Sequence, residues 1–413
     1  MRMQVLEPDL LAEGRPAPLE ITRWHRIPSR LFCFQSRGLS FNSVMDWRWR
    51  RAGTEWMGDG WTGVAAQAMP DATRHTFFPS KKRDFMLQHI RRADVRRSSW
   101  AFGLSALAIS LVASAIFNKE ADKRAERRNP RHGRMIVVDG VKLHFLDTGG
   151  SQPAVLLIHG NAVTSADMEI SGLIDQLKDH HRVIAFDRPG YGYSQRPRDT
   201  SWTPEAQADL FAKALAQCGI DSVTVFGHSW GALVAVACAL RHPHLVKGIV
   251  VASGYYFTTM RADIVLASVA TPPLFGDLMR MTISPLIGRL MLPAAFAKMF
   301  GPLPVPRRFR DRFPASLSLR PIQMRASSEE GRMMAPAAGR LSGQYGSIRA
   351  PMTIIAGEAD EIVDFERHSK ALHDAAPGSR LRLFPGVGHM VHYAETSEIA
   401  SAIDEVGMAI AAA

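Results

Sequence analysis

Short apolar runs alternate with helix-like stretches throughout residues 135–413, and no other feature constrains the fold of this chain as strongly. Several runs, such as 155–158, are apolar at consecutive positions, as strands covered by helices on both faces are. This alternation is typical of a largely parallel α/β sheet, so we predict an eight-stranded, mostly parallel sheet flanked by helices. The expected strands are 135–139, 141–147, 154–158, 182–186, 222–226, 247–252, 352–356 and 381–384, and the expected helices lie near 166–177, 204–217, 230–241, 365–375 and 395–411.

Chemically distinctive residues stand where the predicted strands end. The most specific of them is Gly-His-Ser-Trp-Gly at 227–231, between an apolar strand and an alanine-rich helix. The other segments are His-Gly-Asn at 159–161, a glycine-rich stretch at 187–194, Gly-Glu-Ala-Asp at 357–360 and Gly-Val-Gly-His at 386–389. A serine, an aspartate and a histidine therefore follow one another along the chain in that order.

The motif G-x-S-x-G between a strand and a helix, with this residue order and an upstream His-Gly, resembles the α/β-hydrolase superfamily. The resemblance covers about residues 135–413. It implies an α/β-hydrolase fold with a helical cap, and a hydrolase activity that uses no metal and no cofactor. It also implies a catalytic triad in which Ser229 is the nucleophile, His389 the base and Asp360 the acid.

These residue types suit that chemistry. A serine hydroxyl is a weak nucleophile until a base takes its proton, and an acid must hold the imidazole in the correct tautomer. Gly227 and Gly231 lack the Cβ atoms that would collide in a tight strand-to-helix turn around Ser229. The alternatives that remain open are Glu358, Glu361 and Asp364 for the acid, and His392 for the base.

The developing charge on a substrate oxygen needs preorganised donors. By resemblance, these are the backbone N–H groups of Asn161 and Trp230, and Trp230 also starts a helix whose dipole favours negative charge. The side chain of Asn161 is an alternative, because some dehalogenases of the superfamily use such an asparagine as a halide ligand. Those enzymes carry an aspartate at the position of Ser229, which argues against that reading. We expect 187–194 to be a structural turn beside the site.

The regular alternation of predicted strands and helices stops between residues 254 and 350, in a stretch rich in Met, Leu, Phe and Pro. The superfamily commonly inserts a helical cap at this point, so we predict a cap at 254–350. Most of its apolar residues are expected to pack against the core, and its methionines also suit a hydrophobic substrate. His228, Tyr255 and Tyr256 are candidate pocket residues, with a packing role as the alternative for each.

An uncharged run at 98–118 lies between two clusters of basic residues. Eighteen helical residues extend for ~27 Å, close to the ~30 Å of a hydrocarbon core. We predict a single-pass N-terminal membrane anchor in contact with lipid. The alternatives are a buried core helix and a signal peptide cleaved after Ala113-Ser114-Ala115, which would leave a secreted or periplasmic enzyme. Ile116 and Phe117 continue the apolar run past that cleavage site, which favours retention.

Residues 1–85 show no hydrophobic periodicity, and we predict a disordered extension or a reading frame that begins before a natural start at Met86. Residues 119–134 are expected to form a basic linker. The net charge of +11 comes entirely from the first third, because residues 1–134 hold 24 basic and 13 acidic side chains and residues 135–413 hold 26 of each. A basic catalytic domain that binds nucleic acid is therefore not expected. The three cysteines are too scattered for a disulfide framework or a metal site.

Together these features predict a membrane-anchored serine hydrolase that cleaves an ester-type bond of a small to medium hydrophobic substrate through an acyl-enzyme. Thioester, lactone, amide or carbon–carbon bond hydrolysis and perhydrolysis use the same triad and are alternatives. The non-enzymatic alternative is a ligand-binding scaffold on the same fold, although such proteins usually lose a member of the triad.

Overall fold

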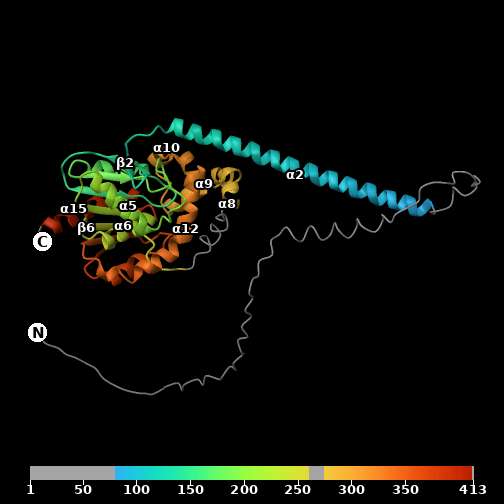
Figure 1. Cartoon of the computed structure of the whole chain (residues 1–413). Helices are drawn as coiled ribbons and strands as arrows, with labels where there is room; N and C mark the ends of the chain where they lie inside the picture. Colours follow the sequence, from blue (N-terminus) through green and yellow to red (C-terminus); the bar gives the residue numbers. More distant parts are fainter. Residues whose placement is uncertain (1–79, 260–273, 412–413) are drawn as a thin grey trace, which may run out of the picture. The chain divides into compact units, whose positions relative to one another are not determined.

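The chain is represented by a computed structural model in which residues 80–259 and 274–411 are described (Figure 1). It divides into two units, Met1–Phe85 and Met86–Ala413. The predicted disordered extension at 1–85 lies almost wholly outside the described residues. The second unit contains the sheet and, apart from the first residues of α2, all the helices described below.

Eight strands form one sheet in the order β1-β2-β4-β3-β5-β6-β7-β8. β2 pairs antiparallel with β1 and with β4, and the other neighbouring strands are parallel. The predicted eight-stranded, mostly parallel sheet is confirmed. The strands are β1 (Arg134–Val138), β2 (Val141–Asp147), β3 (Ala154–Ile158), β4 (Arg182–Phe186), β5 (Val223–His228), β6 (Val246–Ala252), β7 (Met352–Gly357) and β8 (Arg380–Phe384).

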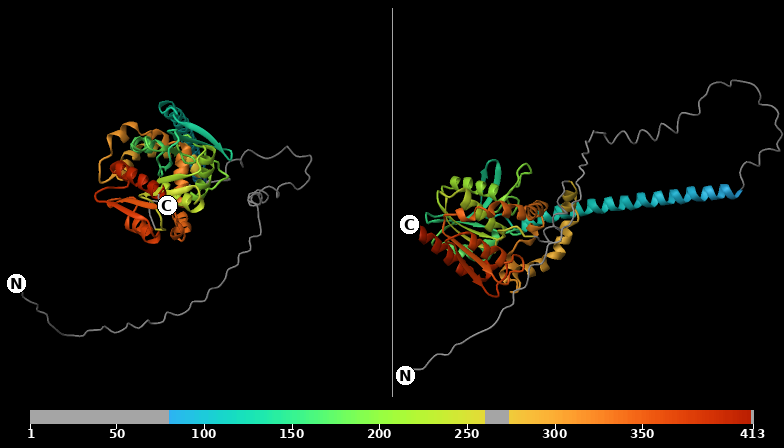
Figure 2. Two further views of the ribbon diagram at one scale, coloured as in Figure 1. Left: turned by 90° about the vertical axis from the view of Figure 1, so that its left-hand side faces the viewer. Right: turned by 90° about the horizontal axis from the view of Figure 1, so that it is seen from below.

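Helices cover both faces of this sheet (Figures 1 and 2), because the side chains of each strand alternate between two apolar cores. Along β3, Leu156 and Ile158 belong to the core that α5 and α6 close, whereas Val155 and Leu157 belong to the core that α4 and α15 close. The helices of the two layers are α3 (Ala166–Ile170), α4 (Leu173–Leu177), α5 (Pro204–Gln217), α6 (Trp230–Arg241), α13 (Ala371–Ala375), α14 (Val391–Ala394) and α15 (Thr396–Ala411), with the π-helical turn η3 (Glu366–Lys370) before α13.

A helical cap stands between β6 and β7, as predicted, although residues 260–273 of it lie outside the described part of the chain. Phe300, Phe309 and Phe313 of the cap pack with Tyr393 of α14, with ring centroids 5.1 Å apart for Phe300 and Tyr393. The cap therefore rests on the segment that directly follows His389. Its elements are α8 (Phe275–Met281), α9 (Ser284–Phe300), α10 (Arg307–Arg312), α11 (Ala315–Ser318), α12 (Pro321–Ser342) and the 3₁₀ turn η2 (Tyr345–Ser347).

One continuous helix of 49 residues, α2 (Ser80–Arg128), precedes the sheet and extends beyond the predicted run at 98–118 at both ends. Between Phe102 and Phe117 its large apolar side chains are mostly exposed; Phe102 is 78% and Ile109 69% exposed. The core-helix alternative is therefore wrong. Residues 119–128, expected to be linker, continue the helix because they are rich in Ala, Glu, Lys and Arg, which have high helix propensity. Only residues 129–133 connect α2 to β1.

Close backbone contact joins β5 to α6. Gly227 lies against the backbone of Gly231, and Gly231 lies against the carbonyl oxygen of Ile158 on β3, so a Cβ at either glycine would overlap backbone atoms. Between them, Ser229 adopts φ 55° and ψ −120°, a region that residues with a Cβ rarely occupy. The turn that carries Ser229 is thus fixed by packing on both sides.

We predict that Gly227→Ala destabilises the protein by about 3 kcal/mol or more, because the neighbouring backbone cannot move away from the added methyl group. Gly331→Ala on α12 is the matched control. A Cβ at Gly331 meets no atom within 4 Å, so the substitution should be neutral or stabilise by roughly 0.5–1 kcal/mol through helix propensity. Urea unfolding followed by circular dichroism measures both, and equal stabilities for the two variants would contradict this account.

Candidate active site

Ser229, His389 and Asp360 form one hydrogen-bonded chain. The Oγ atom of Ser229 lies 3.0 Å from Nε2 of His389, and Nδ1 of His389 lies 2.8 Å from Oδ2 of Asp360. The three residues come from the turn before α6, the loop after β8 and the loop after β7. The side chains of His389 and Asp360 are 5% and 1% exposed, so the bond between them is largely shielded from water. The fold thus brings together the three residues that the sequence pattern selected.

The carboxylate of Asp360 is also held from its other side. Its Oδ1 atom accepts hydrogen bonds from the backbone N–H groups of Ile362 at 2.8 Å and Val363 at 2.9 Å. These bonds leave Oδ2 directed at His389, which is the arrangement that fixes an imidazole tautomer. The rival acids Glu358, Glu361 and Asp364 are exposed, and none of them contacts His389.

The backbone of Asn161 lies beside Ser229 as well. At the preceding residue, Gly160, a Cβ would lie only 3.1 Å from the Cβ of Ser229. Within the described residues, the N–H groups of Asn161 and Trp230 donate to no protein acceptor. Two unused N–H groups next to a serine hydroxyl are what an oxyanion hole requires.

The side chain of Asn161, by contrast, is occupied by contacts within the protein. Its Nδ2 donates to the carbonyl oxygen of Ser327 on α12 at 3.2 Å, and its Oδ1 lies 3.0 Å from the hydroxyl of Tyr191. The amide is therefore not free to serve as a halide ligand, and the residue is available to the site through its backbone.

A buried ion pair connects the core to the cap next to this asparagine. Arg188, from the loop after β4, lies 2.6 Å from Glu330 of α12, and neither side chain is exposed. The guanidinium also donates to the carbonyl oxygens of His159 and Gly160, each at 2.9 Å. The Tyr191 hydroxyl that contacts Asn161 lies 2.7 Å from the other oxygen of Glu330. Sequence reasoning missed this network, since Glu330 lies 142 residues from Arg188 in a helix with no distinguishing motif.

The segment 187–194 forms the structural turn that we expected. Asp187 accepts hydrogen bonds from the backbone N–H groups of Ser165 and Tyr193, and it pairs with Nδ1 of His144 at 2.7 Å. Burial, the largest single influence, would raise the pKa of the Asp187 carboxyl, but the bond to His144, the charges of His144 and His159 and the bond from Tyr193 together lower that pKa. An ionised aspartate therefore holds the loop that carries Arg188.

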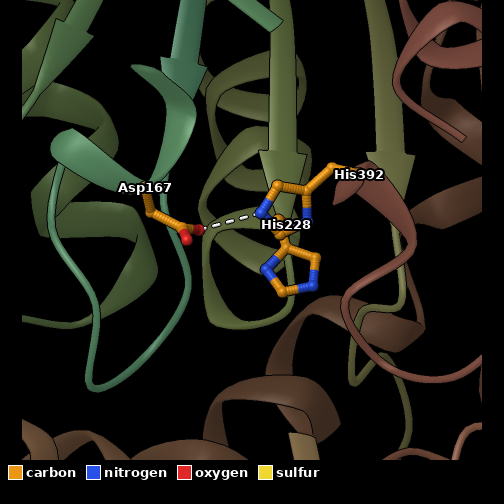
Figure 3. A group of neighbouring side chains, drawn as sticks. All are labelled: Asp167, His228 and His392. Carbon is orange, nitrogen blue, oxygen red and sulfur yellow. Dashed lines mark hydrogen bonds and ion pairs between the residues drawn. The ribbon is translucent and has the colours of Figure 1, made fainter. Parts of the chain in front are cut away.

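A second buried cluster lies behind His389 and consists of Asp167 of α3, His228 at the end of β5 and His392 of α14 (Figure 3). Nε2 of His392 lies 2.9 Å from Oδ2 of Asp167, and the hydroxyl of Tyr393 donates to Oδ1 at 2.8 Å. His392 therefore pairs with Asp167 and not with Ser229, which removes it as the rival base.

These three side chains offer metal-binding atoms within 4.8 Å of one another, which makes the cluster a candidate metal site. Protein donors already occupy both oxygens of Asp167. Nε2 of His228 bonds to the carbonyl oxygen of His389 at 2.9 Å, and its Nδ1 faces Gly160, where a Cβ would lie 3.1 Å away. We therefore interpret the cluster as a packed support for the loop that carries His389.

Three predicted pocket residues require correction. His228 is 1% exposed and packs behind His389, because the strand β5 extends through it into the interior. Tyr255 is buried, bonds to the carbonyl oxygen of Thr259 and packs on the ring of His368. Tyr256 is fully buried in the main core. The packing alternative is thus the one that the structure supports for all three.

The fold and the arrangement of Ser229, His389 and Asp360 are those of the α/β-hydrolase class. Residues 153–396, more than half of the chain, match the alpha/beta hydrolase fold family, and the chain belongs to this family. The similar proteins with a named activity are predominantly hydrolases, in agreement with the predicted enzyme class.

Individual similar proteins differ in what they act on. The 2-hydroxy-6-oxo-2,4-heptadienoate hydrolase of Pseudomonas putida is 28% identical over 281 residues, which are 64% of this chain and 91% of that protein. A thermophilic esterase from Thermogutta terrifontis aligns with a TM-score of 0.55 and 21% identity over 68% of this chain and 99% of its own. A membrane phospholipase A, described as a bacterial virulence factor, aligns with a TM-score of 0.52 and 20% identity over 80% of this chain and 100% of its own.

We predict that the protein loses stability as the pH falls below 6.5. Burial, with the charge of Arg188, lowers the pKa of His159 to about 3, and burial with His392 and His389 holds the pKa of His228 well below its ordinary value. Both histidines stay neutral in the folded state while the unfolded chain protonates them near pH 6.5, so acid favours unfolding. The free energy of unfolding should fall by up to about 2.7 kcal/mol per pH unit.

Urea unfolding at pH 7.5, 6.5 and 5.5 checks this expectation. Burial opposes protonation of His144, but the bond to Asp187, the charge of Asp187 and the bond to the backbone of His132 together raise its pKa, so its contribution to stability is lost as the pH rises above 6.5. The effect of His144 on the free energy of unfolding is therefore opposite in sign to that of His159 and His228, and it falls above pH 6.5 instead of below it. A free energy of unfolding that stays constant between pH 6.5 and 5.5 would show that His159 and His228 are not held neutral.

Proposed function

We propose that this protein is a membrane-anchored serine hydrolase that cleaves an ester-type bond of a small to medium hydrophobic substrate. The observation that carries the proposal is the hydrogen-bonded chain from Asp360 through His389 to Ser229. Esterases and other hydrolases among the similar proteins support the reaction class.

The reaction follows from the positions of these atoms. Nε2 of His389 takes the hydroxyl proton as Oγ of Ser229 attacks the ester carbonyl carbon, and Asp360 stabilises the imidazolium. The N–H groups of Asn161 and Trp230 bind the oxygen that becomes negative. The imidazolium then protonates the leaving alcohol, and an acyl group remains on Ser229. A water molecule, deprotonated by His389, hydrolyses that ester and restores the enzyme.

The exposed apolar surface of α2 supports anchoring. The segment Phe102–Arg128 is long and apolar enough to cross a membrane, and its basic C-terminal part can extend towards headgroups. Cleavage after Ala115 would cut this helix, and it would separate Ser114 from Asn118, both of which bond to the cap. The similarity to the membrane phospholipase A also supports a membrane location. That similarity covers 80% of the chain, whereas residues 135–413 make up 279 of 413 residues, or 68%. The similarity therefore extends into the part of the chain that precedes residue 135.

We predict that Ser229→Ala abolishes fluorophosphonate labelling and lowers turnover of p-nitrophenyl esters by about 10⁶-fold, with the fold intact. Asp360→Asn should lower turnover by about 10⁴-fold, because the neutral amide no longer holds the imidazole tautomer. Glu361→Gln is the matched control, since Glu361 is a neighbouring exposed acid and should leave kcat unchanged. Full labelling of the Ser229→Ala variant would place the nucleophile elsewhere.

We predict that the protein expressed with a C-terminal tag stays in the membrane pellet after carbonate extraction. Its intact mass should include residues 98–118. The matched control is a variant with Leu107→Glu and Ile109→Glu, which places two charges in the exposed apolar part of α2 and should shift the protein to the supernatant. A soluble product that begins at Ile116 would mean that the segment is a cleaved signal peptide.

A further inference from the structure

The cap carries a second apolar surface that the sheet does not cover. On α8 and α9, the exposed side chains are predominantly large and apolar, and Leu290 is 83% and Met291 60% exposed. The exposed members of this set, which we call the α8–α9 surface, are Phe275, Leu278, Met281, Leu286, Ile287, Leu290 and Met291. Apolar side chains gathered in this way on a soluble surface usually mark an interaction site.

The composition of these two helices is that of a membrane segment. Phe275–Met281 and Ser284–Phe300 together are long and apolar enough to span a bilayer, but a bend of 66° separates them. The 17 residues of α9 include only two charged side chains, Arg289 and Lys298. A bent apolar pair of this kind can enter a bilayer from one side without crossing it.

The bend between α8 and α9 lies against the C-terminal end of the apolar run of α2 (Figure 1). The side-chain amide of Asn118 on α2 donates to the carbonyl oxygens of Met281 at 3.1 Å and Thr282 at 2.7 Å. The hydroxyl of Ser114 donates to the same carbonyl oxygen of Thr282 at 2.7 Å. A helix C-terminus leaves carbonyl groups without partners, and in lipid such groups must be satisfied by protein donors. Ser114 and Asn118 supply those donors at the level where the predicted membrane span ends.

Near Asn118, at the end of the apolar run of α2, charged groups are arranged as at a membrane interface. Nη1 of Arg289 donates to Oδ1 of Asn118 at 3.1 Å, and its guanidinium lies over the ring of Phe117. Lys119, Arg124 and Arg127 are exposed on the next turns of α2. Basic side chains just beyond an apolar span favour anionic headgroups.

We propose that the α8–α9 surface inserts into the acyl-chain region of the bilayer beside α2, so that the cap itself is the second membrane contact of this enzyme. The proposal rests on the anchoring by α2 that is proposed above. The occupant of the surface is lipid, because hydrogen bonds join the bend between α8 and α9 to the end of the apolar run of α2, and basic residues follow that run.

This placement has a consequence for the substrate. The C-terminal end of α9 reaches the catalytic loop, since Gly388, the residue before His389, lies against the carbonyl oxygen of Gly301. The 17 residues of α9 extend for ~26 Å, so the helix leads from the membrane interface to the loop that carries the base. An ester dissolved in the bilayer would therefore reach the cap directly from the lipid phase.

The test uses the full chain in vesicles of phosphatidylcholine and phosphatidylglycerol. Cys33 and Cys218 are replaced by serine, and an environment-sensitive NBD dye is attached at Leu290→Cys. The remaining Cys238 is 4% exposed in the main core, which shields its thiol from the dye, and burial raises its pKa to about 12. Met408→Cys is the matched control, because Met408 is an exposed apolar residue of α15 that lies outside the cap. We expect lipids with brominated acyl chains to quench the dye at position 290 and not at 408.

Each other outcome overturns the proposal in a distinct way. A dye at 290 that is water-exposed on protein that does pellet with vesicles would mean that α2 anchors and the cap does not insert. A blue-shifted dye that brominated lipid does not quench would mean that protein, such as a second copy of this chain, covers the surface. Failure of the full chain to pellet at all would refute the anchoring by α2 together with the insertion.

Kinetics provide an independent readout. Leu290→Glu with Met291→Glu should lower hydrolysis of p-nitrophenyl palmitate carried in vesicles by about tenfold or more, because two apolar side chains no longer enter lipid. The same variant should hydrolyse soluble p-nitrophenyl butyrate at the wild-type rate, which shows that the site is intact. Met408→Glu should leave both rates unchanged. Equal losses on both substrates would point to damage of the cap and would contradict the proposal.

Discussion

The contact between β5 and α6 at Gly227 and Gly231 is the constraint on which the rest of the site depends. It forces Ser229 into a backbone conformation that costs of order 1–3 kcal/mol. The cost is sustained because β5 is paired with β3 and β6 along its length and α6 is buried at ten of its twelve positions. Because packing on both sides holds this conformation, the hydroxyl of Ser229, which we propose as the nucleophile, is oriented before a substrate binds.

The cap takes part in this preorganisation, because it contacts the catalytic loops at two separate places. Through α12, Ser327 and Glu330 hold the side chain of Asn161 and its neighbour Tyr191. Through the end of α9, the backbone at Gly301 packs against the residue before His389. The same insertion therefore contacts the segments that carry Asn161 and His389, the residues that we propose as oxyanion donor and base, so the position of the cap is coupled to the geometry of both segments.

The sheet and the group of Ser229, His389 and Asp360 could be predicted because local patterns encode them: consecutive apolar positions mark the buried strands, and G-x-S-x-G marks the turn. Residues whose role depends on a distant partner carry no such pattern. Glu330 is one acid among many until Arg188 is found beside it, and His392 looks like a rival base until Asp167, 225 residues away, takes its Nε2. Tyr255 and Tyr256 follow a strand as pocket residues do, but the fold turns them inward.

The ion pair between Arg188 and Glu330 has a consequence for recombination between related enzymes. Caps are attractive units to exchange, since each is a single insertion between two strands. A foreign cap without a carboxylate at the position of Glu330 would leave the guanidinium of Arg188 buried and uncompensated, and breaking a buried pair in this way costs about 3–5 kcal/mol. A cap and the domain that receives it are therefore compatible only if the cap supplies the carboxylate and the domain supplies the guanidinium. A chimera must contain both charged groups.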